Sequence, residues 1–202
     1  MYAILISGPP ASGKTTFAKY ASNELNILFV SKDTIKEILF DTIGFKNRNE
    51  KINLNIASNN IINYFLENIM IIKSSILIES NFENTQKDAI NYLIKKYNYK
   101  LINVIFDADI NILYNRFIER NNDSNRHKGH ITNFTFPIND EKEFIINNLS
   151  LSEFKNEIIN RGIKGFCLSG DVIKVDTTDF NKVSYNNILC ELKCKINKIL
   201  YK

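Results

Sequence analysis

The chain has 202 residues, of which 44% are hydrophobic and 24% are charged, and these values are ordinary for a globular protein. This length predicts a single domain, residues 1–202, that buries a core without disulfides or structural metal. A net charge of +4, from 26 basic and 22 acidic residues, is too small to indicate nucleic-acid binding by itself. No apolar run approaches the roughly 20 residues that span a bilayer, so we expect a cytoplasmic protein without membrane contacts.

Short apolar segments alternate with helical patterns, which predicts an α/β fold with a parallel sheet. The expected strands, apolar nearly throughout as in strands buried on both faces, are Tyr2–Ser7, Ile27–Val30, Ser75–Glu79, Leu101–Phe106 and Val172–Val175. The expected helices are about Lys14–Leu25, one from near Thr34, then about Lys51–Lys73, Thr85–Tyr97, Ile110–Arg120, Leu151–Arg161 and Val183–Leu200. The polar segment Asn121–Asn139 reads as a mobile loop within the domain.

The first expected strand, with no basic leader before it, runs into a glycine loop that ends in Gly13-Lys14-Thr15. This loop matches the Walker A pattern, in which successive backbone amides and a helix N-terminus bind phosphate groups. We expect Lys14 to reach the β- and γ-phosphates and the Thr15 hydroxyl to bind magnesium. The residues expected to hold the nucleotide are Gly8, Pro9, Pro10, Ala11, Ser12, Gly13, Lys14, Thr15 and Thr16.

The rest of the chain indicates which class of phosphate-binding protein this is. No Asn-Lys-x-Asp guanine motif occurs, and no Asp-x-x-Gly switch motif follows the third strand, so ATP with Mg²⁺ is the expected ligand pair, and a short chain favours a small kinase. Asp33 follows the second strand at the sheet edge where ligands gather. It is a candidate general base for a substrate hydroxyl, and the alternative is that Asp33 only caps the next helix.

Four segments together resemble the small P-loop kinases of the zeta-toxin, chloramphenicol phosphotransferase and polynucleotide 5′-kinase group, among the AAA-family ATP-binding proteins. They are Gly8–Thr15, Ser31-Lys32-Asp33, Ile76–Phe82 and Arg116-x3-Arg120. The resemblance implies a three-layer P-loop nucleoside triphosphate hydrolase fold with a five-stranded parallel sheet in the order 2-3-1-4-5 and a helical lid. It also implies that Asp33 is the general base, and that Arg116, Arg120 and Arg126 belong to the lid.

Glu79 ends the third strand beside the phosphate loop, where a carboxylate can hold magnesium or orient the substrate. The similar kinases more often have Asp at this place, and the alternative is a polar strand end that faces solvent. Arg116 and Arg120 share a helix face, and an anion between them would relieve their repulsion. We therefore expect both arginines to be catalytic, stabilising the transferred phosphoryl group.

The polar segment 121–139 is the expected lid, with Arg126 binding the phosphates and His127 reaching phosphate or substrate at its tip. A solvated loop is the alternative. By resemblance, Thr177 and Thr178 lie near the adenine; alternatively, Thr178 and Asp179 cap the last helix. Cys190 and Cys194 lie four apart on that helix and, as a poor metal site, are expected to pack against the chain.

The acceptor side is expected within about residues 34–73, where no residue spacing is diagnostic. Phe40 and Phe45 either stack on the acceptor or belong to the core. We expect a kinase that phosphorylates a small-molecule hydroxyl. Two alternatives are a nucleotide-binding regulatory protein without an acceptor and a zeta-toxin-like kinase of a sugar nucleotide. Nucleic acid is an unfavoured acceptor, because no basic groove with interleaved aromatics is evident, and the sequence leaves the oligomeric state open.

Overall fold

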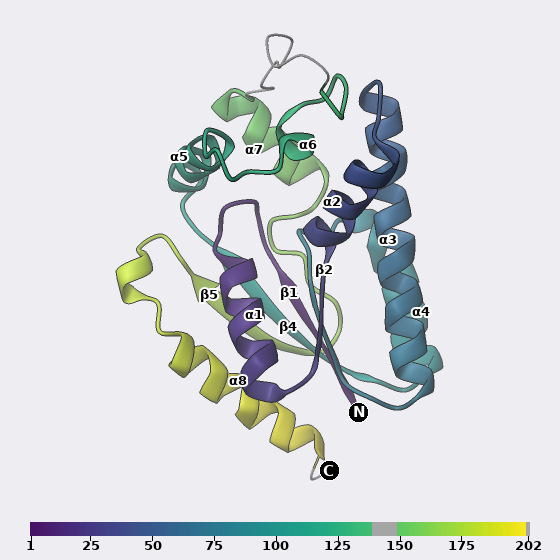
Figure 1. Cartoon of the computed structure of the whole chain (residues 1–202). Helices are drawn as coiled ribbons and strands as arrows, with labels where there is room; N and C mark the ends of the chain where they lie inside the picture. The colour runs from purple at the N-terminus through teal and green to yellow at the C-terminus, as the bar shows by residue number, and fades with distance from the viewer. Residues whose placement is uncertain (139–148, 201–202) are drawn as a thin grey trace.

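A computed structural model describes residues 1–138 and 149–200, which form a central parallel sheet with helices on both faces (Figure 1). The strand order is β2-β3-β1-β4-β5 and every pairing is parallel, as predicted. The strands are β1 Tyr2–Ser7, β2 Leu28–Ser31, β3 Ile76–Glu79, β4 Lys100–Asp107 and β5 Asp171–Asp176. Each lies within about two residues of its predicted bounds, because a doubly buried strand is apolar throughout and polar residues mark its ends.

The helices also follow the predicted order. They are α1 Lys14–Leu25, α2 Lys32–Ile43, α3 Arg48–Ile71, α4 Lys87–Lys96, α5 Ile110–Asn121, α6 Lys128–Ile131, α7 Leu151–Asn160 and α8 Tyr185–Leu200, with 3-10 turns η1 at Asn84–Gln86 and η3 at Phe180–Lys182. Helix α3 begins three residues earlier than expected, because the Asn47 side chain accepts a hydrogen bond from the Glu50 amide at 3.0 Å and caps it. The short helix α6 was not predicted.

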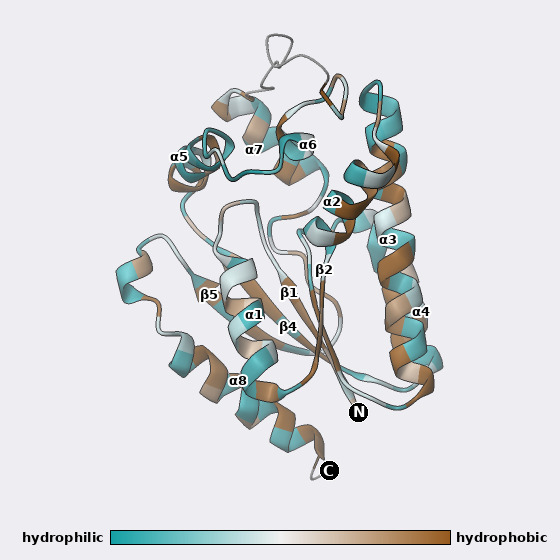
Figure 2. Ribbon diagram, viewed as in Figure 1, coloured by the Kyte–Doolittle hydropathy of each residue, from teal (hydrophilic) through white to brown (hydrophobic). Residues whose placement is uncertain are grey.

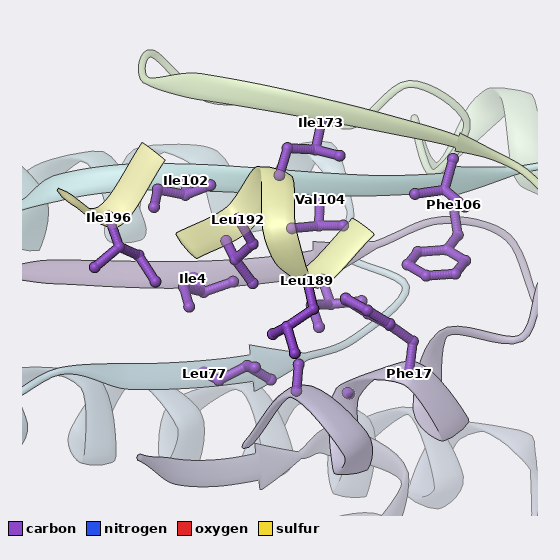
Figure 3. Packing of buried hydrophobic residues seen from close by; sticks show 14 of the residues in the cluster. Ile4, Phe17, Leu77, Ile102, Val104, Phe106, Ile173, Leu189, Leu192 and Ile196 are labelled. Atoms are coloured by element: carbon purple, nitrogen blue, oxygen red, sulfur yellow. The ribbon is translucent and has the colours of Figure 1, made fainter. Parts of the chain in front are cut away.

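Two hydrophobic layers cover the sheet. On one face, Ile4, Leu77 and Ile102 pack against Phe17 of α1 and Leu192 of α8 (Figure 3). On the other face, side chains of α3 and α4 pack against Leu5, Ile76 and Ile78. Figure 2 shows the hydrophobic colour concentrated along the strands and on the helix sides turned toward them. The carboxyl ends of the strands remain outside both layers, and α5, α6 and α7 lie beyond those ends (Figure 1).

One prediction about the last helix is wrong. Cys190 and Cys194 are exposed and unbonded, whereas α8 buries Leu189, Leu192 and Ile196. A helix buries positions three and four residues apart, and the two cysteines lie on a different set of such positions. Among the described helices, none is long and apolar enough to cross a bilayer.

Candidate functional site

The phosphate loop joins β1 to α1 and requires glycine at both of its ends. Gly8 has φ 139°, and a Cβ atom on it would lie 2.0 Å from the carbonyl oxygen of Phe106 in β4. Gly13 has φ 84°, and its Cβ atom would lie 2.9 Å from the Phe180 ring. Glycine alone combines these angles with this close approach of neighbouring groups. The loop therefore holds its backbone against two other segments, directly before the N-terminus of α1.

Lys14 and Glu79 form the buried floor of the site. The Lys14 ammonium donates to the Pro9 carbonyl at 2.8 Å, and its nitrogen lies 4.0 Å from Glu79 Oε1. Burial lowers the pKa of Lys14 to about 8, although Glu79 and Asp33 oppose the shift. Burial likewise raises the pKa of Glu79, against the effects of Lys14 and the hydroxyl of Ser31, which donates to Glu79 at 3.0 Å. The alternative of a solvent-facing strand end at Glu79 is wrong.

The expected magnesium ligands, Thr15 and Glu79, are neighbours. A hydrogen bond from the Thr15 side chain to Glu79 opposes the rise in the pKa of Glu79 that burial causes. Within residues 1–138 and 149–200, no group of three His, Cys, Asp or Glu side chains is placed to hold a metal ion. One hydroxyl and one carboxylate suit Mg²⁺, which keeps several waters and takes its other ligands from phosphate oxygens. The residues present thus fit magnesium bound together with a nucleotide.

Asp33 lies in the first turn of α2, and the N-cap of that helix is Ser31. The alternative that Asp33 is the capping residue is therefore wrong. Burial opposes ionisation of Asp33, but the positive charges of Lys36, Arg126 and Arg120, together with protonated His130, hold its pKa well below the usual range. Asp33 is consequently a carboxylate at neutral pH and can accept a proton.

The two arginines of α5 are placed differently. Arg116 donates to the carbonyl oxygens of Thr177 at 2.7 Å and Thr178 at 3.2 Å, and its guanidinium carbon lies 3.8 Å from the centre of the Phe180 ring. Arg120 instead interacts with the charges of both Lys14 and Asp33. The structure thus puts Arg120 beside the phosphate loop and joins Arg116 to the segment after β5.

Arg120 and Arg126 share a further property that fits an anion. The Nε atom of each is buried, and neither has a hydrogen-bond partner in the part of the chain that the structure describes. The same is true of Ser12 Oγ in the phosphate loop. Buried donors without partners are costly, and phosphate oxygens would satisfy them. These three orphaned groups fit a bound triphosphate.

The segment after β5 is fixed by its own side chains. The Thr177 hydroxyl and amide donate to the Asp107 carbonyl at 3.1 and 2.8 Å, and the Thr178 hydroxyl accepts from the Asp109 amide at 3.0 Å. A hollow of about 440 Å³ lies between this segment and the phosphate loop, and it is lined by Gly13, Thr16, Tyr20, Phe180, Val183, Ser184, Tyr185 and Asn186. Its position beside Gly13 would suit a base attached to the phosphates.

The predicted mobile loop contains α6, which is tied to α2 by two histidine–carboxylate pairs. His130 Nε2 lies 2.9 Å from Glu37 Oε1, and His127 Nε2 lies 3.0 Å from Asp41 Oδ1. His127 therefore contacts a protein carboxylate, where we had expected phosphate or substrate. A Cβ on Gly129 would lie 2.5 Å from the Phe40 ring, so the two helices touch there. Asn139, the last residue of the predicted lid, lies outside the described residues.

Lys51 of α3 makes hydrogen bonds, missed by sequence reasoning, to α6 and the segment after it. Its ammonium donates to the carbonyl of His130 at 3.1 Å, to Asn133 Oδ1 at 3.2 Å and to the carbonyl of Thr132. The sequence shows only a lysine on an expected helix. Because its partners lie 79 to 82 residues away, the sequence does not indicate these contacts. Phe40 and Phe45 are buried in a small core between α2 and α3, which confirms the alternative that they belong to the core and excludes stacking on an acceptor.

Comparisons with known proteins agree with this geometry. A family model described as an AAA domain matches residues 4–134, and no curated protein matches the sequence. A candidate kinase from Chloroflexus aurantiacus J-10-fl superposes with a TM-score of 0.74 at 20% identity, over 98% of this chain and 96% of that one.

Two further solved structures share the architecture. A sugar kinase from Janibacter sp. HTCC2649 has a TM-score of 0.56 at 12% identity, over 98% of this chain and 95% of its own. A gluconokinase from Sinorhizobium meliloti 1021 has a TM-score of 0.55 at 12% identity, over 100% of this chain and 97% of its own. At such identities these similarities establish the fold alone, a P-loop fold with sheet order 2-3-1-4-5.

Proposed function

This chain belongs to the AAA domain family, and from that premise we propose that it is an ATP-dependent kinase that phosphorylates a hydroxyl group of a small molecule. One observation carries the proposal. Asp33, an ionised carboxylate, interacts with the charges of the phosphate-loop lysine Lys14 and of Arg120 and Arg126, whose Nε atoms are buried and have no partner among the described residues. A nucleotide-binding protein without an acceptor has no use for a base at this place. The structural neighbours named as a sugar kinase and a gluconokinase support a small-molecule acceptor.

In the proposed reaction the acceptor hydroxyl lies between Asp33 and the γ-phosphorus of ATP. Its oxygen forms a bond to that phosphorus, and the bond from phosphorus to the β–γ bridging oxygen breaks with its electron pair going to ADP. The hydroxyl proton passes to the Asp33 carboxylate, which the surrounding cations keep ionised until then. In this step one bond to phosphorus forms and another breaks, and no further reactant is needed.

The remaining site residues stabilise charge. Lys14, Arg120 and Arg126 would neutralise the γ-phosphoryl oxygens, on which negative charge is spread in the transition state. Thr15 and Glu79 would hold magnesium, which supplies positive charge to the β- and γ-phosphate oxygens. Arg116, in contact with Phe180, would act on the base side of the nucleotide.

We further propose that the whole chain is one kinase domain, with residues 121–139 as its lid and about 34–73 as its acceptor side.

Labelled ATP incubated with a deproteinised metabolite extract tests the proposal. We expect a labelled product, and we expect Lys14→Ala and Asp33→Asn each to slow its formation by about 10² to 10⁴-fold, the usual contribution of a proton-transfer or charge-stabilising group. Asp88→Asn is the matched control, because Asp88 also lies in a first helical turn but is exposed on α4. Full transfer by Asp33→Asn would contradict the assigned base.

A further inference from the structure

Four cationic side chains gather around Asp33 and Glu83, and we call them the acceptor-side cations. They are Lys32, Lys36, Arg126 and Arg161. The charge of Lys36 interacts with Asp33, Arg161, Arg126 and Glu83, whereas that of Lys14 interacts with Glu79, Asp33 and Arg120. Asp33 is the one residue common to both sets. The acceptor-side cations thus form a second positive cluster, and Asp33 interacts both with this cluster and with the lysine of the phosphate loop.

Among the described residues, Glu83 and Glu157 are the carboxylates that form ion pairs with this cluster. Glu83 Oε1 accepts from Arg161 at 2.6 Å and lies 3.6 Å from the Lys32 ammonium, so one carboxylate serves two buried or half-buried cations. Arg161 has an additional partner in Glu157 at 3.3 Å. Asp33 is a further carboxylate whose charge acts on Lys36. Glu37 also acts on Arg126 but is hydrogen-bonded to His130, and Lys51 adds a positive charge that interacts with Lys36 and Arg126.

Lys36 and Arg126 are the least compensated members. Neither has an ion pair with any described residue; the Lys36 ammonium lies 5.5 Å from the Phe40 ring, and Arg126 Nε is buried without a partner. Burial is the main reason that the pKa of each is lowered, which means that the folded chain holds these charges at a cost. A bound anion would remove that cost.

A neutral donor points to the same place. Gln86 of η1 accepts a hydrogen bond from the Glu83 amide at 3.0 Å through its side-chain oxygen, which fixes the amide group beside Glu83. Its Nε2 atom is buried and has no partner among the described residues. This unpartnered amide donor belongs to a residue bonded to Glu83, the carboxylate that pairs with Arg161 and Lys32, and an oxyanion could satisfy it.

We propose that the acceptor carries a phosphate or carboxylate group in addition to its reactive hydroxyl, and that Lys36 and Arg161 bind this anionic group. The inference rests on the proposed kinase function. Binding of the anion on the far side of Asp33 from Lys14 would leave the hydroxyl of the same molecule facing the carboxylate. The site would then select acceptors by charge before any contact with the hydroxyl is made.

Fractionation of the metabolite extract on an anion-exchange resin tests the inference. The extract is separated into a retained, anionic fraction and an unretained fraction before either is incubated with the protein and labelled ATP. We expect the labelled product to form from the retained fraction only. A product formed equally well from the unretained fraction would overturn the inference and leave the kinase function standing. Absence of product from both fractions would instead contradict the kinase function itself.

A substitution then links the charge preference to this cluster. With the active fraction as acceptor source, Lys36→Gln should raise the acceptor concentration needed for half-maximal rate at least tenfold. The ATP concentration needed for half-maximal rate should rise much less. Lys19→Gln, at an exposed position of α1, is the matched control and should change neither. Treatment of the fraction with a phosphatase separates the two anions, because it destroys a phosphate-bearing acceptor and spares a carboxylate. Equal dependence on acceptor in Lys36→Gln and the control would refute the assignment.

Discussion

Two regions of the molecule interact with Asp33, and they are built in different ways. The phosphate loop is made by the backbone of consecutive residues between β1 and α1. The contact between α2 and α6, which we call the clasp, is made by side chains, His127 with Asp41 and His130 with Glu37, 86 and 93 residues apart. The phosphate loop depends on steric fit of its backbone, whereas the clasp depends on the protonation state of its histidines. The two regions should therefore fail under different perturbations.

The largest effect is expected where the loop has no room. Gly8→Ala would place a methyl group 2.0 Å from a backbone oxygen, at a φ of 139°. Strain and overpacking of about 1–3 kcal/mol each predict a loss of about 4 kcal/mol in the free energy of unfolding. Gly165→Ala is the matched control, since Gly165 has φ 72° but nothing within 4 Å of its Cβ position, and should cost about 1 kcal/mol. Urea denaturation of both variants measures the difference, and equal losses would mean that φ alone matters.

The arginines of α5 sharpen the comparison within one helix. Arg120→Gln should lower kcat about 10²-fold, because it removes a donor from the developing charge. Arg116→Gln should mainly raise the KM for ATP, by roughly tenfold or about 1.4 kcal/mol, because Arg116 fixes the segment at Thr177 and Thr178. Steady-state kinetics with varied ATP separate these effects. Equal changes in kcat and in the KM for ATP in both variants would show that the two side chains act together.

The phosphate loop and the sheet could be predicted because their determinants are local. The run Tyr2–Ser7, its glycines and Lys14 lie together in the sequence, and a doubly buried strand has a composition of its own. The clasp could not be predicted, since nothing near His127 or His130 in the sequence indicates Asp41 or Glu37. Arg116 was placed with Arg120 from helical spacing and from the family resemblance, and neither reveals that Arg116 bonds to the carbonyls of Thr177 and Thr178.

The pH dependence of stability should originate in the clasp. Burial, with Lys36 and Arg126, lowers the pKa of His130 to about 4 against the opposing effects of Glu37 and Asp33. Between about pH 6.5 and pH 4 the unfolded chain therefore binds a proton that the folded chain does not, so stability falls as the pH falls. From pH 7 to pH 5 this residue should account for a loss of about 2 kcal/mol. His130→Gln keeps a donor for Glu37 and should lose less stability over that interval in urea denaturation, whereas an unchanged pH dependence would locate the titration elsewhere.

The smallest expected effect comes from the outer pair of the clasp. Asp41 is mostly exposed, with 63% of its side chain accessible, so its contact with His127 should stabilise the fold by about 1 kcal/mol or less. A double-mutant cycle with His127→Ala and Asp41→Ala measures that coupling directly. The pair would serve to position Arg126, because His127 follows Arg126 in the chain and the charge of Arg126 acts on Asp33. Both single variants should then reduce kcat by a few-fold, and neither should add to the loss in Arg126→Ala. Additive losses would mean that the pair acts independently of Arg126, and that the clasp serves stability alone.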